Sequence, residues 1–258
     1  MIRQTGKIIT PSKNGSLRIE KNKAIPAPWY GLLKDVASTY KSVFEDNLLS
    51  VYIRGSVADG TAILGVSDFD SLAVCKASVN KDQFQLLEQF ELTLSQKFPF
   101  TTSVEFCAYE LNQVLTCPEY APVRFQIKSL SRCVYGDDIS EKIEEFTIKT
   151  VPDLCRHSVI DSYNYAKKII ESNHSTLDTI MICRWIMKQL VRAAFECNMR
   201  TGDFYTRDLY HCAKSACQHF PNLKDELWRS VELAVAPTSN EKEVLLLAQK
   251  IINSIQAV

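Results

Sequence analysis

Two short runs of sequence set the architecture of this chain: VYIRGS at residues 51–56 and, 11 residues later, DFDSLAV at residues 68–74. The first run is apolar and partly β-branched up to a glycine, which is typical of a strand that ends in a turn. The second opens with Asp68 and Asp70 and continues as an apolar strand. Because side chains alternate along a strand, we expect these two carboxylates to point the same way.

This pairing of residues predicts a site for a cation and a phosphate group. Two carboxylates held side by side repel each other unless a cation lies between them, and Mg²⁺ prefers such oxygen ligands. Gly55 allows the backbone to approach a phosphate closely, and the Ser56 hydroxyl can add a hydrogen bond. A phosphate-binding turn beside a metal pair is typical of phosphoryl or nucleotidyl transfer, in which the protein mainly positions groups and neutralises charge.

A third acid is expected on a neighbouring strand, and Glu105 supplies it. It is an isolated charge within TTSVEFCA at residues 101–108, where an unpaired carboxylate is unfavourable unless it faces a metal or a substrate proton. Two roles are open from the sequence: a metal ligand, or a general base that accepts the proton of an attacking hydroxyl. The alternative is a solvent-facing glutamate on an edge strand.

The pattern of apolar residues changes near residue 150. Before it, helical spacing predicts helices over 29–45, 82–98 and 119–130, and short apolar runs predict strands over 48–53, 71–75, 102–109 and 133–135. After it, only helices are expected, over 157–172, 177–199, 206–220, 223–235 and 240–255. We therefore predict an N-terminal arm over 1–28, an α/β domain over 29–150 and a helical domain over 151–258.

Composition and charge exclude several classes of protein. The chain has 258 residues, 46% of them hydrophobic, and a formal net charge of zero, which are ordinary values for a globular protein. Residues 26–150 carry 11 Lys and Arg against 17 Asp and Glu, so stable nucleic-acid binding is not expected. The sequence shows no membrane span, no apolar segment of a secretory signal and no CxxC motif among its nine cysteines. We expect a cytoplasmic protein with reduced cysteines.

At this point the residues resemble a known family. Gly55-Ser56, 11 residues, then Asp68 and Asp70 and a later strand acid is the pattern of the DNA polymerase β-type nucleotidyltransferase superfamily. The α/β part followed by helices is similar to aminoglycoside nucleotidyltransferases and related bacterial proteins of unassigned substrate. VYGDDI at residues 134–139 and YTRDLY at residues 205–210 add local similarity, and the resemblance covers roughly residues 30–240.

The resemblance implies an α+β fold, with a polymerase β-like mixed sheet followed by an all-α helical bundle. It implies that Asp68, Asp70 and Glu105 bind Mg²⁺, that Gly55 and Ser56 hold the phosphates of ATP or another nucleoside triphosphate, and that the substrate site lies between the domains.

A basic ridge is expected on the helix over 177–199. Arg184, Lys188 and Arg192 follow one another at intervals of four residues. We interpret Lys188 and Arg192 as candidates for binding the triphosphate or the leaving pyrophosphate. The alternative is a solvated face in which Glu196 pairs with Arg192.

Two further motifs favour structural interpretations. Arg207-Asp208 precedes a predicted helix and is typical of an N-terminal cap, with nucleotide binding as the weaker alternative. A zinc site from His211, Cys212, Cys217 and His219 has no standard spacing, and core packing is favoured there.

The predicted activity is transfer of a nucleoside monophosphate, AMP from ATP in the first instance, to a hydroxyl of a small molecule such as an aminoglycoside-like compound. The alternative is a non-catalytic or self-modifying regulatory protein of the antitoxin type. Addition of nucleotides to RNA ends is disfavoured by the acidic charge of residues 26–150. A homodimer is compatible with the sequence.

Overall fold

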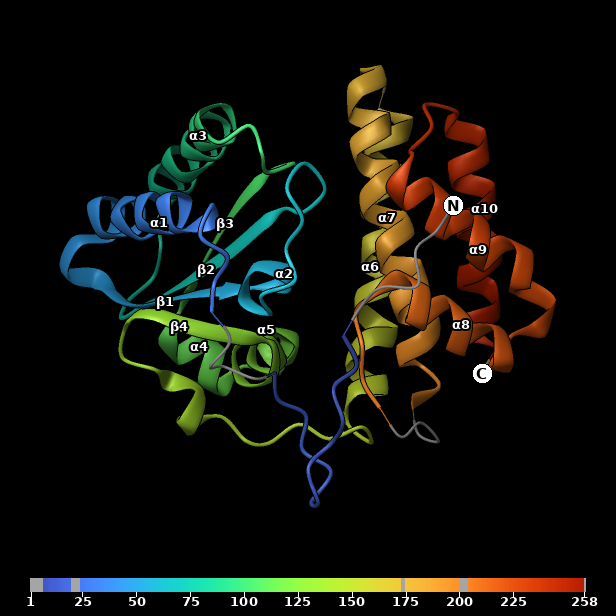
Figure 1. The fold of residues 1–258 in the computed structure, drawn as a ribbon, viewed down its shortest axis with the longest axis horizontal. Coiled ribbons are helices and arrows are strands. Elements are labelled where there is room, and N and C mark those ends of the chain that lie inside the picture. Colours follow the sequence, from blue (N-terminus) through green and yellow to red (C-terminus); the bar gives the residue numbers. More distant parts are fainter. Residues whose placement is uncertain (1–6, 20–23, 173–174, 200–203, 258) are drawn as a thin grey trace. The chain divides into compact units, whose positions relative to one another are not determined.

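The computed structural model describes residues 7–19, 24–172, 175–199 and 204–257 (Figure 1). The chain divides into two compact units. One unit, Arg18–Phe146, holds the β-sheet. The other unit consists of the described residues of Met1–Leu17 and Thr147–Val258 and holds the long C-terminal helices.

Four strands form a mixed sheet in the order β3-β2-β1-β4. They are β1 (Leu48–Arg54), β2 (Phe69–Cys75), β3 (Val104–Glu110) and β4 (Ser131–Gly136). β1 pairs antiparallel with both β2 and β4, whereas β2 and β3 run parallel and are joined through helix α3, Lys81–Lys97. Most residues of the two central strands are buried, because helices cover both faces of the sheet.

The two faces of the sheet are covered by different helices. Helices α1 (Trp29–Phe44) and α3 lie on one face, and α4 (Leu111–Thr116), α5 (Ala121–Phe125) and the π-helical turn η3 (Gln126–Leu130) lie on the other (Figure 1). On the first face, the ring of Tyr40 packs edge-on against Phe106, with centroids 4.9 Å apart. On the second, Tyr52, Leu72 and Val74 are buried in an apolar cluster with residues of α4 and η3.

Several short helices of three or four residues lie between the longer elements of the two units. They are η1 (Glu45–Asn47), α2 (Gly55–Ala58), η2 (Pro118–Tyr120), η4 (Ile139–Lys142) and η6 (Pro221–Leu223). The sequence predicted one helix over 119–130, and this was wrong, because η2, α5 and η3 divide that stretch into three turns. Pro118 and Pro122 each occupy the first turn of a new element, where a missing N–H costs nothing. Helix α4 was not predicted.

Within its described residues, the second unit contains the α-helices α6 (Val151–Glu171), α7 (Thr176–Glu196), α8 (Leu209–His219), α9 (Lys224–Val235) and α10 (Glu241–Gln256). Helix α7 packs against each of the other four, and its Ile186, Met187 and Leu190 are fully buried. Its start is fixed by a capping box between Ser175 and Asp178. None of the helices in the described part of the chain is both long and apolar enough to cross a membrane.

The N-terminal arm pairs with the helical unit over a long sequence distance. The N–H of Ile9 donates to the carbonyl of Tyr205 at 2.7 Å, and the N–H of Tyr205 donates back at 2.9 Å. This isolated bridge breaks the expectation of helix alone after residue 150. Asp208 was predicted to cap the N-terminus of a helix. It lies at the N-cap position of α8, but its side chain makes no cap hydrogen bond. Its carboxylate instead accepts a hydrogen bond from the backbone N–H of Lys7.

Candidate active site

The strand register brings four polar residues into one row across the sheet. Arg54 at the end of β1 lies opposite Asp70 of β2 on one side and opposite Ser131 of β4 on the other. Asp70 in turn lies opposite Glu105 of β3. Residues that pair directly across strands share a face, so Ser131, Arg54, Asp70 and Glu105 project from the same side of the sheet.

The turn after β1 is fitted closely to this row. Gly55 has a φ of +70°, a conformation that side-chain-bearing residues rarely adopt. A Cβ atom at this position would lie 2.8 Å from Oδ2 of Asp70. The next residue, Ser56, has its hydroxyl oxygen buried with no hydrogen-bond partner among the described residues. A buried hydroxyl without a partner costs free energy, so a ligand oxygen would satisfy it.

Asp68 and Asp70 flank the start of β2, as the sequence predicts. Asp68 directly precedes the strand and is half-buried, and the Asp70 side chain is only 19% exposed. Burial raises the pKa of Asp70 to about 7. The guanidinium of Arg54 lowers that pKa, and the charges of Asp68 and Glu105 raise it. The negative charges of Asp68 and Glu105 therefore act directly on Asp70. A cation at this place would stabilise the ionised form of Asp70.

Glu105 has a partner that the sequence analysis missed. Nη2 of Arg54 lies 2.6 Å from Oε1 of Glu105 and 3.9 Å from Oδ1 of Asp70. Within the described residues, no three His, Cys, Asp and Glu side chains form a group that could hold a metal ion. The structure thus brings Asp70 and Glu105 together around an arginine. The metal role that the resemblance implies for Asp68, Asp70 and Glu105 stays a prediction. The only signal for the role of Arg54 in the sequence is its position immediately before Gly55.

Asp68 and Asp70 form a pair of carboxylates that fits a divalent ion, beside the turn at Gly55 and Ser56. Asp68 and Asp70 offer hard oxygen ligands, and Gly55 lies against the Asp70 carboxylate. The Ser56 hydroxyl that follows is buried without a partner among the described residues. Oε1 of Glu105 could join such a set only if the Arg54 guanidinium moved away from it.

A buried hydrogen-bond network holds the β3 end of the row in place. The hydroxyl of Tyr40 on α1 lies 3.0 Å from Oγ of Ser71 and donates to the carbonyl of Cys107 at 3.0 Å. Ser71 Oγ donates to the backbone carbonyl of Glu105 at 2.7 Å. From α3, the Glu91 carboxylate accepts the N–H of Phe106 at 2.7 Å. Helices on one face of the sheet therefore fix the backbone of the strand that carries Glu105.

Lys188 and Arg192, predicted as phosphate ligands, lie on α7 of the helical unit and are both half-buried. Nε of Arg192 donates to the backbone carbonyl of Arg207 at 3.1 Å and so ties α7 to the segment before α8. The buried Glu196 accepts a hydrogen bond from the Tyr205 hydroxyl at 2.9 Å and lies 3.6 Å from Nη1 of Arg207. Cys212, one of the four residues considered for zinc, is fully buried.

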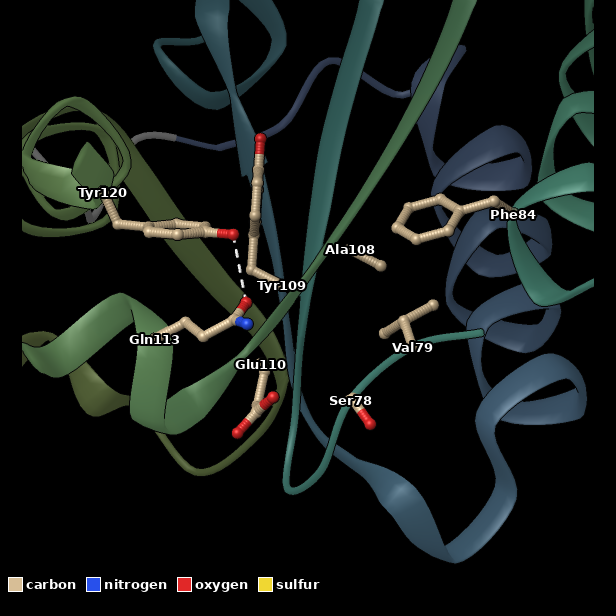
Figure 2. A pocket seen from close by; sticks show the side chains of 8 residues that line it. All are labelled: Ser78, Val79, Phe84, Ala108, Tyr109, Glu110, Gln113 and Tyr120. Carbon is tan, nitrogen blue, oxygen red and sulfur yellow. Dashed lines mark hydrogen bonds between the residues drawn. The ribbon is translucent and has the colours of Figure 1, made fainter. Parts of the chain in front are cut away.

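A separate hollow of about 150 Å³ lies at the other end of β3 (Figure 2). Tyr109 and Tyr120 form one wall, with ring centroids 5.9 Å apart, and Phe84 stands on the opposite side. Asp70 and Glu105 are register partners near the start of these strands, whereas Glu110 pairs with Cys75 at their end. The hollow is therefore distinct from the carboxylate row, and no sequence motif predicted it.

Comparison with known proteins identifies the fold. No family model and no curated protein sequence matches the chain. Among solved structures, the chain is similar to spectinomycin adenyltransferase AAD(9) from Enterococcus faecialis, determined with ATP and spectinomycin. The TM-score is 0.60 at 15% sequence identity, and the match covers 88% of this chain and 99% of that one. The expected fold class is confirmed: an α+β nucleotidyltransferase fold with a helical C-terminal region.

Proposed function

We propose that this chain is a nucleotidyltransferase that moves a nucleoside monophosphate, AMP from ATP in the first instance, to a hydroxyl of a small molecule. The observation that carries the proposal is the fit of Gly55 against Asp70, with Asp68 and Glu105 close enough to act on the same charge. The hydroxyl of the next residue, Ser56, is buried with no hydrogen-bond partner among the described residues. The fold supports the proposal, because the similar solved protein is an adenyltransferase that was determined with ATP.

Each residue of the site has a role in this reaction. Gly55 allows the backbone to approach the triphosphate, and the Ser56 hydroxyl donates to a phosphate oxygen. Asp68 and Asp70 hold Mg²⁺, which when bound neutralises charge on the phosphates. The acceptor oxygen forms a bond to the α-phosphorus, the bond from that phosphorus to the bridging oxygen breaks, and pyrophosphate leaves. Glu105 takes the proton of the acceptor hydroxyl or completes the metal ligands.

The helical unit contributes positive charge in this proposal. Lys188 and Arg192 of α7 are the residues we assign to the triphosphate and the leaving pyrophosphate.

The acceptor is proposed as a small hydroxyl compound. The similar solved protein was determined with spectinomycin, so aminoglycosides and related aminocyclitols are the first class to test. The protein itself belongs in the same test, because a self-modifying regulatory protein would label its own side chains.

The test is transfer of label from an α-³²P-labelled nucleoside triphosphate in the presence of Mg²⁺. We expect pyrophosphate release and a labelled small-molecule product with one or more acceptors. Asp68→Asn and Asp70→Asn should each slow this by about 100-fold or more, since several kcal/mol of charge stabilisation is lost. Turnover that is unchanged in either folded variant would remove the metal role. Label on the chain alone would favour the regulatory protein.

A further inference from the structure

We infer that Arg54 is a resident counter-ion of the carboxylate row, and that its guanidinium competes with a divalent metal ion for these carboxylates. The inference deepens the proposed function, because it concerns the same carboxylates. The position of Arg54 Nη2 carries the inference, and Mn²⁺ binding without nucleotide transfer tests it.

The geometry places Arg54 where the metal ion would act. A single atom, Nη2, lies 2.6 Å from a Glu105 oxygen and 3.9 Å from an Asp70 oxygen. These are oxygens that the proposed function assigns to the metal or to proton transfer. A Mg²⁺ ion binds carboxylate oxygens at about 2.1 Å, so an ion bound to both of these oxygens could not share this place with the guanidinium. An ion on the other oxygens of the two acids would still be repelled by the positive charge.

The contact is built into the sheet. Arg54 is the last residue of β1 and faces Asp70 through the strand register, which in turn faces Glu105. The Arg54 and Asp70 side chains are 20% and 19% exposed, whereas the Glu105 side chain is 46% exposed. Solvent therefore screens the attraction between Arg54 and Asp70 less than it screens the ion pair between Arg54 and Glu105. In the absence of metal, the guanidinium therefore relieves repulsion between the acids and keeps them in place.

The positive charge can leave this position only if the Arg54 side chain moves, and not by loss of a proton. Arginine keeps its charge throughout the accessible pH range, so it competes with a metal ion at every pH. Its Cα lies next to Gly55, and the phosphate-binding turn begins there. A side-chain rotation would carry the positive charge away from Glu105 without moving the strand. Metal affinity in the absence of nucleotide is consequently weaker than the carboxylates alone would give.

The experiment measures Mn²⁺ binding to the full chain without nucleotide, from the electron paramagnetic resonance signal of free Mn²⁺. Arg54→Gln removes the competing charge, and we expect it to tighten Mn²⁺ binding about tenfold, the effect of roughly 1.4 kcal/mol. Arg54→Lys keeps a charge with a less rigid fork and should tighten binding by a smaller factor. Arg18→Gln is the matched control, because Arg18 also contacts two carboxylates of this unit, Glu141 and Glu145. It should leave Mn²⁺ affinity unchanged.

The outcomes separate this inference from the proposed function. If folded Arg54→Gln binds Mn²⁺ no more tightly than the wild type, or more weakly, the guanidinium does not compete with the metal and the inference is overturned. If Arg54→Gln does not fold, Arg54→Lys decides by the same criterion. Tighter Mn²⁺ binding in a protein that transfers no nucleotide would support the counter-ion and contradict the nucleotidyltransferase. Nucleotide transfer by the wild type, together with unchanged Mn²⁺ affinity in Arg54→Gln, would support the nucleotidyltransferase and contradict the counter-ion.

Discussion

At the scale of single residues, the site carries stored electrostatic strain at Asp70. Its pKa is raised to about 7, with burial as the largest cause and the charges of Asp68 and Glu105 adding to it. An unfolded aspartate has a pKa of about 3.9, so below that pH both states are protonated and the group costs nothing. Between about pH 4 and pH 7 the unfolded state ionises first, and stability falls as the pH rises. Above pH 7 the full penalty is present.

Asp70→Asn should therefore make the protein more stable while it removes activity. We expect a gain of about 1–3 kcal/mol at pH 8 in the absence of metal, which shrinks towards zero near pH 4. Urea unfolding at both pH values measures the difference. A variant that is less stable than the wild type at pH 8 would show that the Arg54 contact outweighs the burial of this carboxylate.

Substitution of Gly55, compared with substitution of Gly65, separates the effect of backbone strain from the effect of steric crowding at Asp70. Gly55→Ala places a side chain in the left-handed region and 2.8 Å from the Asp70 carboxylate. Gly65→Ala is the matched control, because Gly65 has a φ of +75° but nothing within 4 Å of its added Cβ. Both should lose about 1 kcal/mol of stability from the backbone term. Only Gly55→Ala should also weaken Mn²⁺ binding, and equal Mn²⁺ affinity in the two variants would contradict the close fit.

The residues of the site were predicted from the sequence to different degrees. Gly55, Ser56, Asp68 and Asp70 lie within one strand-turn-strand segment, so local spacing alone was enough to propose them as one site. The structure places Gly55 against Asp70. The contact between Arg54 and Glu105 joins residues 51 positions apart and depends on the register of three strands. No pattern in a single sequence fixes that register, and the sequence therefore predicted no role for Arg54.

At the scale of elements, β3 is the edge strand that carries Glu105, and its backbone is held by α1 and α3 (Figure 1). Such strands are predicted well from alternating apolar residues, and their bounds here agree with the prediction to within about two residues. The stretch over 111–130 was predicted poorly, because prolines divide it into turns too short to show a helical period.

Tyr40→Phe tests whether α1 positions Glu105. The variant removes a hydroxyl that lies 3.0 Å from Ser71 Oγ and 3.0 Å from the Cys107 carbonyl in a fully buried place. We expect a loss of about 1–3 kcal/mol of stability and a lower kcat with little change in KM for ATP. Tyr52→Phe is the control, because its buried hydroxyl contacts Asp138 and Ile139 instead. Similar stability losses with an equal fall of kcat in both variants would contradict a positioning role for Tyr40.

At the scale of the whole molecule, the change from mixed strands and helices to helices alone was expected at residue 150, and the two compact units part between Phe146 and Thr147. The arm was expected as a separate segment over residues 1–28, whereas the described residues up to Leu17 belong with the helical unit and Arg18 begins the sheet unit. The pairing of Ile9 with Tyr205 joins residues 196 positions apart. Neither hydrophobic periodicity nor composition carries information about a contact of that range.

The arm should therefore stabilise the helical unit, and two neighbouring isoleucines allow a matched test. Ile9 is 9% exposed, whereas Ile8 is 43% exposed. Ile9→Ala should cost about 1–3 kcal/mol through lost burial, and Ile8→Ala should cost less than about 0.5 kcal/mol. Hydrogen exchange adds a local measurement, because the Tyr205 amide donates to the Ile9 carbonyl and should exchange faster in Ile9→Ala. Equal stability and equal exchange in the two variants would show that the arm does not contribute to the stability of the helices.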